Sequence, residues 1–280
     1  MDADLKNVIE VRPGAGRLSG ATVAELGEFG PVLSAFASRF VKVKYKQMVV
    51  GLAWALLQPV LSAGVLALVV GAAGHSLADS HVPYLLFVLA GMVGWTYFAT
   101  ATNAAAQSIV DDAGLIQKVY FPREIIPIAA VLAALVDLAA ALLTLAVVTA
   151  AYGNLPSVSW LALPLPILVL VLCATAAGLV LSALNVYYRD VRYVVPFLLQ
   201  LGLFGSAVFY SPGSLAAPWD TIYTIVNPLV AAIESLRTIM ISNDWPDPAI
   251  LLPALAWAAV LMIVGFAVFK RLEREFSDRV

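Results

Sequence analysis

The sequence predicts an all-α polytopic membrane protein. Of its 280 residues, 62% are hydrophobic and only 12% are charged, and the mean hydropathy is +0.92. A single soluble core cannot bury so large a share of apolar side chains. The apolar residues also gather in long uncharged runs, and about 20 such residues form a helix that crosses a hydrocarbon layer about 30 Å thick.

The chain is expected to begin with a tail and a surface helix. Residues 1–24 mix charges with glycine and proline and show little periodicity, which predicts a flexible tail. Residues 25–50 are expected to contain an amphipathic interface helix, because their apolar residues share one arc of a helical wheel and their basic residues flank it. The arc contains Phe29, Val32, Leu33, Phe36, Phe40 and Val43, and its flank contains Arg39, Lys42 and Lys46.

A transmembrane domain is predicted over residues 51–270, with a cytoplasmic tail at 271–280. Its six spans are expected at about 51–72, 84–102, 125–150, 161–184, 194–209 and 249–269. The polar segment 104–124 contains Pro122, which disfavours helical geometry at the residue before it, so a cytoplasmic elbow is expected there. The apolar patch 228–241 is too short to span comfortably and is predicted to be re-entrant or interfacial.

Basic residues predict the orientation. Fifteen of the 16 Lys and Arg residues fall before the first span, between the second and third spans, between the fourth and fifth spans, or in the tail. The exception is Arg237. Because basic residues favour the cytoplasmic side, the distribution predicts six spans with both the N- and C-termini in the cytoplasm.

Several kinds of chemistry are not expected in this chain. It has no GxxxxGK[ST] motif, so it has no phosphate-binding loop of that type, and ATP with Mg is expected to bind a separate subunit. His75 and His81 lack a matching pattern of Cys or carboxylates, and Asp111 and Asp112 diverge by about 100° on a helix, so no metal site is predicted. The single cysteine, Cys173, excludes an intrachain disulfide and is expected to be a small buried residue. No catalytic or cofactor-binding residue is predicted.

Asp137 lies in the middle of the third predicted span. An unpaired carboxylate there costs about 2.5–3.5 kcal/mol on insertion scales, so it should face the interior of the bundle. Two interpretations remain open. Asp137 contacts the substrate, or it forms a structural hydrogen bond to a neighbouring helix, with Asn185 or Gln200 as the expected partner.

The fifth predicted span carries candidates for a sugar path. Phe204 and Phe209 stand beside Gly202, Gly205 and Ser206, which thin the helix and allow another helix to approach. Carbohydrate rings stack on aromatic faces, whereas aromatic residues near span ends also form the interfacial belt of any membrane protein. The residues nominated for a channel or substrate path are Asp137, Gln200, Phe204, Phe209 and Tyr210.

Four blocks carry a resemblance to a known family. They are VKYKQMVVGLAWALLQP at 43–59, LIQKVYFPREIIPIAAVLAALVD at 115–137, LSALNVYYRDVRYVVPFLLQLGLFGSAVFYSP at 181–212, and NPLVAAIESLR at 227–237. Over about residues 36–270 the chain resembles the permease subunits of ABC-2 type polysaccharide exporters, the Wzm and TarG group.

The resemblance implies partners and roles. Two permease copies would bind two copies of an ATPase subunit in the bacterial inner membrane and export a lipid-linked polysaccharide such as O antigen, teichoic acid or galactan. The elbow would be the coupling helix, with Asp112, Lys118, Arg123 and Glu124 at the ATPase. Re-entrant helices with Asn227, Glu234 and Arg237 would cap the channel outside, and Glu234 and Arg237 are spaced to pair on one helical face. Nucleic acid is not an expected partner.

The basic residues of the interface helix have two possible roles. Arg39, Lys42, Lys44 and Lys46 would attract the anionic head group of a lipid-linked glycan, each contributing about 1 kcal/mol near an anionic surface. Alternatively, they anchor the helix to ordinary membrane lipids.

Other functions remain open at this point. The same architecture suits an ABC-2 permease for a drug or small lipid. A membrane-embedded lipid-phosphate glycosyltransferase would need carboxylates clustered with His or Arg, and the loops are short and poor in such clusters. A passive channel would show no dependence on an ATPase.

Overall fold

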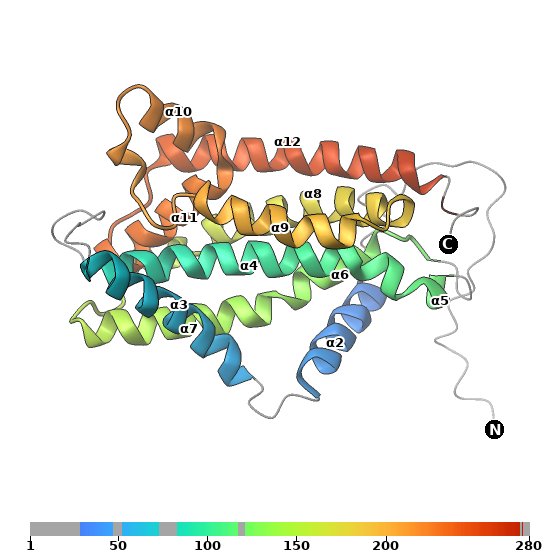
Figure 1. The fold of residues 1–280 in the computed structure, drawn as a ribbon, viewed down its shortest axis with the longest axis horizontal. Coiled ribbons are helices and arrows are strands. Elements are labelled where there is room, and N and C mark those ends of the chain that lie inside the picture. The colour runs from blue at the N-terminus through green and yellow to red at the C-terminus, as the bar shows by residue number, and fades with distance from the viewer. Residues whose placement is uncertain (1–28, 47–51, 73–82, 117–120, 275, 277–280) are drawn as a thin grey trace.

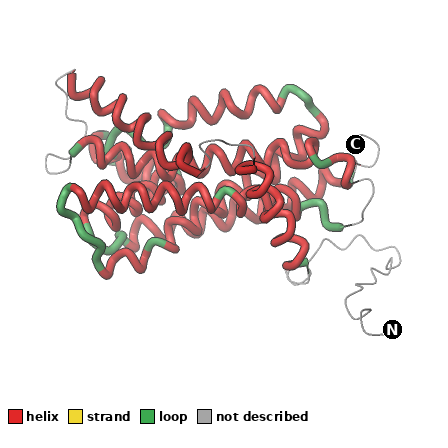
Figure 2. The backbone as a smooth tube through the Cα atoms, turned by 90° about the horizontal axis from the view of Figure 1, so that it is seen from below, coloured by secondary structure: helices red, strands yellow, loops and turns green. Residues whose placement is uncertain are grey.

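The computed structural model describes residues 29–46, 52–72, 83–116, 121–274 and 276. Figures 1 and 2 show that these residues form an elongated bundle of helices joined by loops, with no strand in the part of the chain described. The expected tail at 1–24 lies outside these residues, as do His75, His81 and Lys118.

The first half of the bundle contains α2 (Gly30–Lys46), α3 (Leu52–Ala72), α4 (Tyr84–Asp111), α5 (Ala113–Ile116), α6 (Ile125–Ala133) and α7 (Leu135–Ala151). The second half contains η1 (Val158–Ala162), α8 (Pro164–Tyr187), α9 (Val191–Phe204), η2 (Pro212–Ser214), α10 (Trp219–Val226), α11 (Pro228–Arg237), the π-helical turn η3 (Thr238–Ser242) and α12 (Pro248–Glu273).

Four segments are long and apolar enough to cross a membrane. They are Tyr84–Asp111, Ile125–Ala151, Val158–Tyr187 and Pro248–Glu273. The pair Trp219–Val226 and Pro228–Ser242, bent by 100°, would be a fifth if it is one broken span. The chain is therefore a multi-pass membrane protein. The predicted first and fifth spans correspond to α3 and α9, whose apolar segments are the shorter Leu57–Val69 and Val191–Phe204.

Small residues bring the central helices close together. α8 packs against both α4 and α12. A Cβ placed on Gly178 of α8 would lie 2.5 Å from the Cβ of Ala105, and one placed on Gly265 of α12 would lie 2.7 Å from the carbonyl oxygen of Ala176. These contacts allow backbones to approach as closely as they do in other membrane bundles.

The second helix extends further than expected. Residues 104–111, predicted as part of the elbow, continue α4 to Asp111. Ala105, Ala106 and Ile109 are buried against the bundle. On the partly exposed side of the helix, the Gln107 amide N–H donates to the side-chain oxygen of Asn103, one turn earlier, at 3.1 Å. The polar residues that suggested a loop thus belong to an amphipathic helix end.

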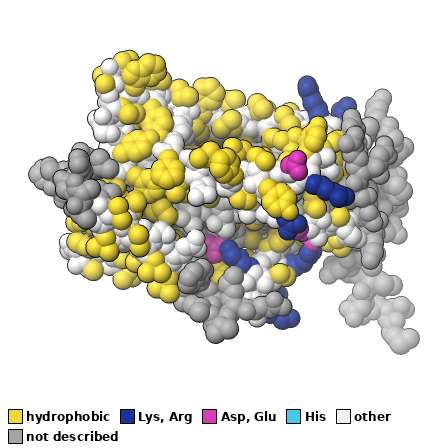
Figure 3. Space-filling model, in the orientation of Figure 1, with side chains coloured by type: hydrophobic (Ala, Val, Ile, Leu, Met, Phe, Trp, Pro, Cys, Tyr) yellow, Lys and Arg dark blue, Asp and Glu magenta, His cyan; other side chains and the backbone are white. Residues whose placement is uncertain are grey.

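The apolar face of α2 packs on protein along much of its length. Phe36 is buried in a cluster with Ile125, Ile126 and Ala129 of α6. Val43, predicted on the same face, is 66% exposed. Figure 1 shows α2 inclined to the bundle axis, near one end of the bundle. Figure 3 shows Lys and Arg side chains gathered at the same end of a largely apolar surface. We call this end of the bundle the α2 end. The opposite end, with α10 and α11, is the Arg237 end.

Candidate transport path and coupling site

The helix α9 presents an apolar surface that no other described segment covers. Among its side chains only Val195 is buried. Its large exposed residues are Tyr193, Val194, Phe197, Leu198, Leu201 and Phe204. Gln200 also lies on the exposed side. An apolar face of this size in one chain suits either lipid or another protein surface.

An aromatic cluster forms where α9 ends. The rings of Phe204 and Phe209 are 5.5 Å apart, and those of Tyr210 and Tyr223 are stacked 6.5 Å apart. The Tyr223 hydroxyl donates to the carbonyl of Gly205 at 2.6 Å and lies 3.0 Å from the Tyr210 hydroxyl. Three of the nominated path residues therefore lie together. Tyr223, which sequence analysis missed, joins them because α10 folds back over the end of α9.

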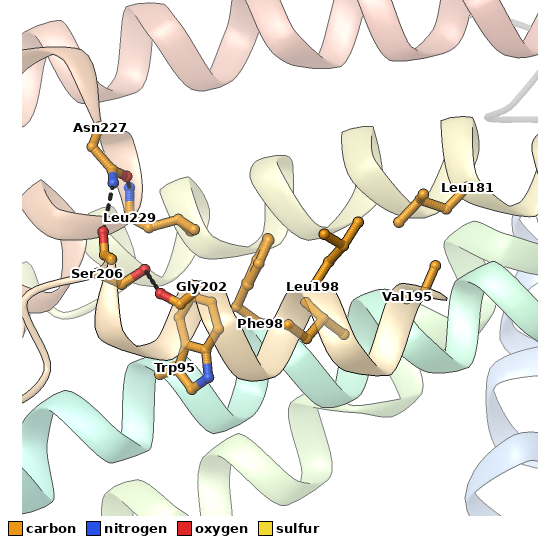
Figure 4. A pocket seen from close by; sticks show the side chains of 11 residues that line it. Trp95, Phe98, Leu181, Val195, Leu198, Gly202, Ser206, Asn227 and Leu229 are labelled. Carbon is orange, nitrogen blue, oxygen red and sulfur yellow. Dashed lines mark hydrogen bonds between the residues drawn. The ribbon is translucent and has the colours of Figure 1, made fainter. Parts of the chain in front are cut away.

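A cavity of about 300 Å³ lies beside this cluster, between α4, α8 and α9 (Figure 4). Trp95 and Phe98 supply aromatic walls, and a Cβ on Gly202 would lie 2.7 Å from the Trp95 ring. The polar groups at one end are those of Ser206 and Asn227, which donate to the carbonyls of Gly202 and Gly205, respectively. The glycine expected to thin α9 thus provides room for Trp95.

The α10–α11 pair turns at Asn227, whose side chain accepts the N–H of Leu229 at 3.1 Å and caps α11. Proline follows at the first helical position, where its missing N–H costs no hydrogen bond. The sequence NP therefore ends α10 and begins α11. This explains the sharp bend between the two helices.

Arg237 connects α11 to the rest of the bundle through hydrogen bonds. It is 5% exposed, and its guanidinium donates to the carbonyls of Phe87 at 3.1 Å, Ala207 at 2.8 Å and Val208 at 2.7 Å. It also pairs with Glu234, as the i,i+3 spacing predicted, and lies 3.6 Å from the Phe87 ring centroid. One side chain thus joins α11, α4 and the segment after α9.

Asp137 has different partners from those expected. Its carboxylate accepts the ammonium of Lys44 at 2.6 Å and the hydroxyl of Tyr45, both from α2. The expectation of Asn185 or Gln200 was wrong. The amide of Asn185 donates to the carbonyl of Ala106 at 2.9 Å instead. Burial and the Asp137 carboxylate raise the pKa of Tyr45 above its ordinary 10.0, so its hydroxyl remains a donor at neutral pH.

Two of the four nominated coupling residues, Asp112 and Glu124, form ion pairs at the α2 end. Asp112, 7% exposed, pairs with Arg39, and the fully buried Glu124 pairs with Lys270 of α12 at 2.8 Å. Arg123 donates to the carbonyl of Glu273 at 3.5 Å. This end is therefore held by contacts between α2, the elbow and α12.

The four basic residues of α2 fall into two groups. Arg39 and Lys44 are already paired with carboxylates. Lys42 and Lys46 are exposed, and neither forms an ion pair with a residue in the described ranges. Lys42 and Lys46 thus have charges available to an external anion.

Cys173 is free and buried, as predicted. Among the residues that the structure covers, no group of three His, Cys, Asp or Glu side chains could hold a metal ion.

Comparison with known protein families matches most of the chain to one family. A profile of the ABC-2 type transporter family matches residues 32–241, from α2 to η3. The chain belongs to the ABC-2 type transporter family. The family expected from the sequence blocks is thereby confirmed, and the α9 surface, the aromatic cluster and the α2 contacts to Asp112 and Asp137 all fall within the matched region.

Individual relatives match nearly end to end. The chain is 26% identical over 259 residues to the O-antigen export system permease protein RfbA of Myxococcus xanthus, covering 92% of this chain and 98% of that protein. Two proteins of the same name from Klebsiella pneumoniae are 26% and 24% identical over 255 residues, each covering 90% of this chain and 96% of the relative.

Proposed function

We propose that the chain is the permease subunit of an ABC transporter that exports a lipid-linked polysaccharide across the bacterial inner membrane, driven by ATP hydrolysis on a separate ATPase subunit. The observation that carries this proposal is the match to an ABC-2 family profile combined with end-to-end similarity to permeases named for O-antigen export. The absence of a GxxxxGK[ST] motif from the sequence supports a separate ATPase chain.

In this proposal α3 and α9 are the first and fifth of six spans, and both termini are cytoplasmic. The α10–α11 pair is re-entrant and enters from the external side. The distribution of basic residues supports this orientation, since 15 of 16 fall on one side of six spans. Two permease copies face each other, with two ATPase copies below. The uncovered apolar surface of α9 supports a second copy as its partner.

The glycan path follows α9 towards the aromatic cluster. Exposed ring faces bind sugars by stacking and CH contacts without demanding one sequence of hydroxyls, as a polymer conduit requires. Phe204, which is 62% exposed and contacts Phe209, is the ring best placed to do so. Gln200 lies on the same helix, and Tyr210 stands at its end.

The α2 end receives the lipid head group and the ATPase. Lys42 and Lys46 attract the anionic head group, each contributing about 1 kcal/mol near an anionic surface. Arg39 and Lys44 hold α2 in place. The ATPase docks on α2 and on the elbow that contains Asp112, Lys118, Arg123 and Glu124, so that elbow movement is passed to α4, α6 and α12.

The test is to purify the permease with its cognate ATPase, reconstitute both in liposomes, and measure ATP hydrolysis and glycan export with undecaprenyl-diphosphate-linked glycans. Stable association and hydrolysis that rises with the glycan are expected. Phe204→Ala should lower export without unfolding the permease, since the side chain is exposed in the single chain, and the amount of assembled complex is measured alongside. A folded permease that binds no ATPase, or a complex indifferent to glycan, would contradict the proposal.

A further inference from the structure

The third span consists of two helices that meet next to its one carboxylate. α6 ends at Ala133 and α7 begins at Leu135, and Ala134 between them keeps right-handed helical dihedral angles, with φ of −67° and ψ of −14°. Asp137 lies in the first turn of α7. The Lys44 ammonium donates to one carboxylate oxygen of Asp137, and the Tyr45 hydroxyl donates to the other. Within the described residues, neither oxygen bonds to another span, although an intramembrane carboxylate usually does.

The two halves of α2 contact the bundle differently. Phe36 and its neighbours pack tightly on α6, and Arg39 pairs with Asp112 just after α4. The half that follows lies over a cavity of about 290 Å³ lined by Phe40, Val43, Lys44, Gln107 and Asp137, among others. α2 and α7 have little other contact within the described ranges. The polar contacts at Asp137 therefore join an otherwise loosely packed half of α2 to α7.

α2 contacts the two parts of the third span in different ways. Its apolar face packs on α6, whereas Lys44 and Tyr45 donate hydrogen bonds to Asp137 in α7. α7 in turn packs against α3, the helix that follows α2 in the chain. The cavity leaves room beneath this half of α2, so a tilt of α2 towards α7 would cost little apolar packing there.

We propose that Asp137 is a positioning residue for transport, through which Lys44 and Tyr45 transmit a movement of α2 to α7 and α3. The role rests on the ATP-driven export proposed above, since the ATPase would supply the movement. It builds on the second role considered for Asp137 in the sequence, a hydrogen bond to a neighbouring helix, but the helix is α2 and not another span.

The experiment measures ATP hydrolysis and glycan export separately on the complete permease–ATPase complex in liposomes. Asp137→Asn should lower export about tenfold, within the usual range of coupling between sites, while ATP hydrolysis stays within about twofold of the original. More ATP is then consumed for each glycan exported. Tyr45→Phe, which removes one hydrogen bond and keeps the ring, should produce a smaller change in the same direction.

Charge exchange separates this role from a substrate contact. Lys44→Asp alone should impair coupling as Asp137→Lys does. The double variant Lys44→Asp with Asp137→Lys should restore at least half of the export per ATP, because the pair is re-formed with its charges reversed. Thr144→Val is the matched control on α7, since Thr144 donates only to the carbonyl of Ala140 on its own helix. The control should behave as the original.

Each failure has its own reading. The positioning role is overturned if Asp137→Asn leaves the ATP consumed per glycan unchanged. It is also overturned if the double variant is as defective as the single variants, and that result would favour a substrate contact. If the unaltered permease binds no ATPase, the proposed function fails, and the positioning role fails with it.

Discussion

The two ends of the bundle hold their cations in different ways. At the Arg237 end, one buried guanidinium bonds to three backbone carbonyls and to Glu234. At the α2 end, Arg39, Lys44 and Lys270 pair with side-chain carboxylates. Backbone carbonyls cannot change place without moving the main chain that carries them, whereas carboxylates are carried on side chains that rotate. We therefore expect the Arg237 end to be the more rigid of the two.

The local backbone explains why an arginine is needed at Arg237. α9 ends at Phe204, and the carbonyls of Ala207 and Val208 that follow have no helical turn above them. Ala207 has a φ of 52°, which is uncommon for a residue with a side chain. A planar guanidinium with five N–H groups can satisfy several carbonyls at once.

Removing the fixed cation should have the largest effect. Arg237→Met removes the donor of three backbone carbonyls and the ion pair with Glu234, and we expect a loss of about 3–5 kcal/mol. Arg237→Lys should recover only part of this, because an ammonium cannot reach all the acceptors. Thermal unfolding of the purified permease in detergent measures both variants. Equal melting of Arg237→Met and the original chain would remove the contrast between the ends.

A smaller loss is expected from Lys270→Met. Glu124 is completely buried and would lose its cation, which should cost about 3 kcal/mol. Adding Glu124→Gln should restore most of this stability, because no uncompensated charge remains. Glu273→Gln, at the partly exposed partner of the same lysine, should cost less than about 1 kcal/mol in the same assay. A double variant as unstable as Lys270→Met would show that packing dominates there.

Gly91→Ala tests the Arg237 end without removing any charge. A Cβ at Gly91 would lie 2.7 Å from Nη2 of Arg237 and 2.9 Å from the carbonyl oxygen of Val208, so one of them must move. We expect a loss of about 1–3 kcal/mol in melting experiments. Gly114→Ala is the control at the α2 end, where a Cβ meets nothing within 4 Å. If Gly91→Ala melts at the same temperature as the original chain, Arg237 and its partners can move to accommodate an added methyl group.

The smallest effect should come from Arg39→Gln. Arg39 is 45% exposed, so its pair with Asp112 should contribute about 1 kcal/mol or less, and less still at high salt. Melting at low and at high ionic strength measures this contribution. A loss that is larger and independent of salt would indicate that the α2 end is as rigid as the Arg237 end.

Local patterns allowed much of the fold to be predicted. The apolar run expected at 249–269 appears as α12, Pro248–Glu273, and the pair Glu234–Arg237 follows from spacing on one helix. Phe204 and Phe209 were nominated because the glycines beside them are visible in the sequence. Each of these features depends on residues a few positions apart.

The rest depends on contacts between distant parts of the chain. Lys44 and Asp137 are 93 residues apart, and Lys270 and Glu124 are 146 apart, so no local periodicity relates them. The sequence places Asp137 inside a span but does not show that Lys44 and Tyr45 of α2 lie against it. The role of Tyr223 likewise required knowledge of how α10 folds back onto α9.

The close packing of α8 determines which substitutions the centre of the bundle can accept. Gly178 and Gly265 meet Ala105 and Ala176 with no room for an added methyl group. In a membrane, burying a larger apolar side chain at such a position gains no hydrophobic free energy, because lipid is equally apolar. Tolerance in a saturation mutagenesis screen should therefore rank by side-chain volume at these four positions, with serine accepted before leucine.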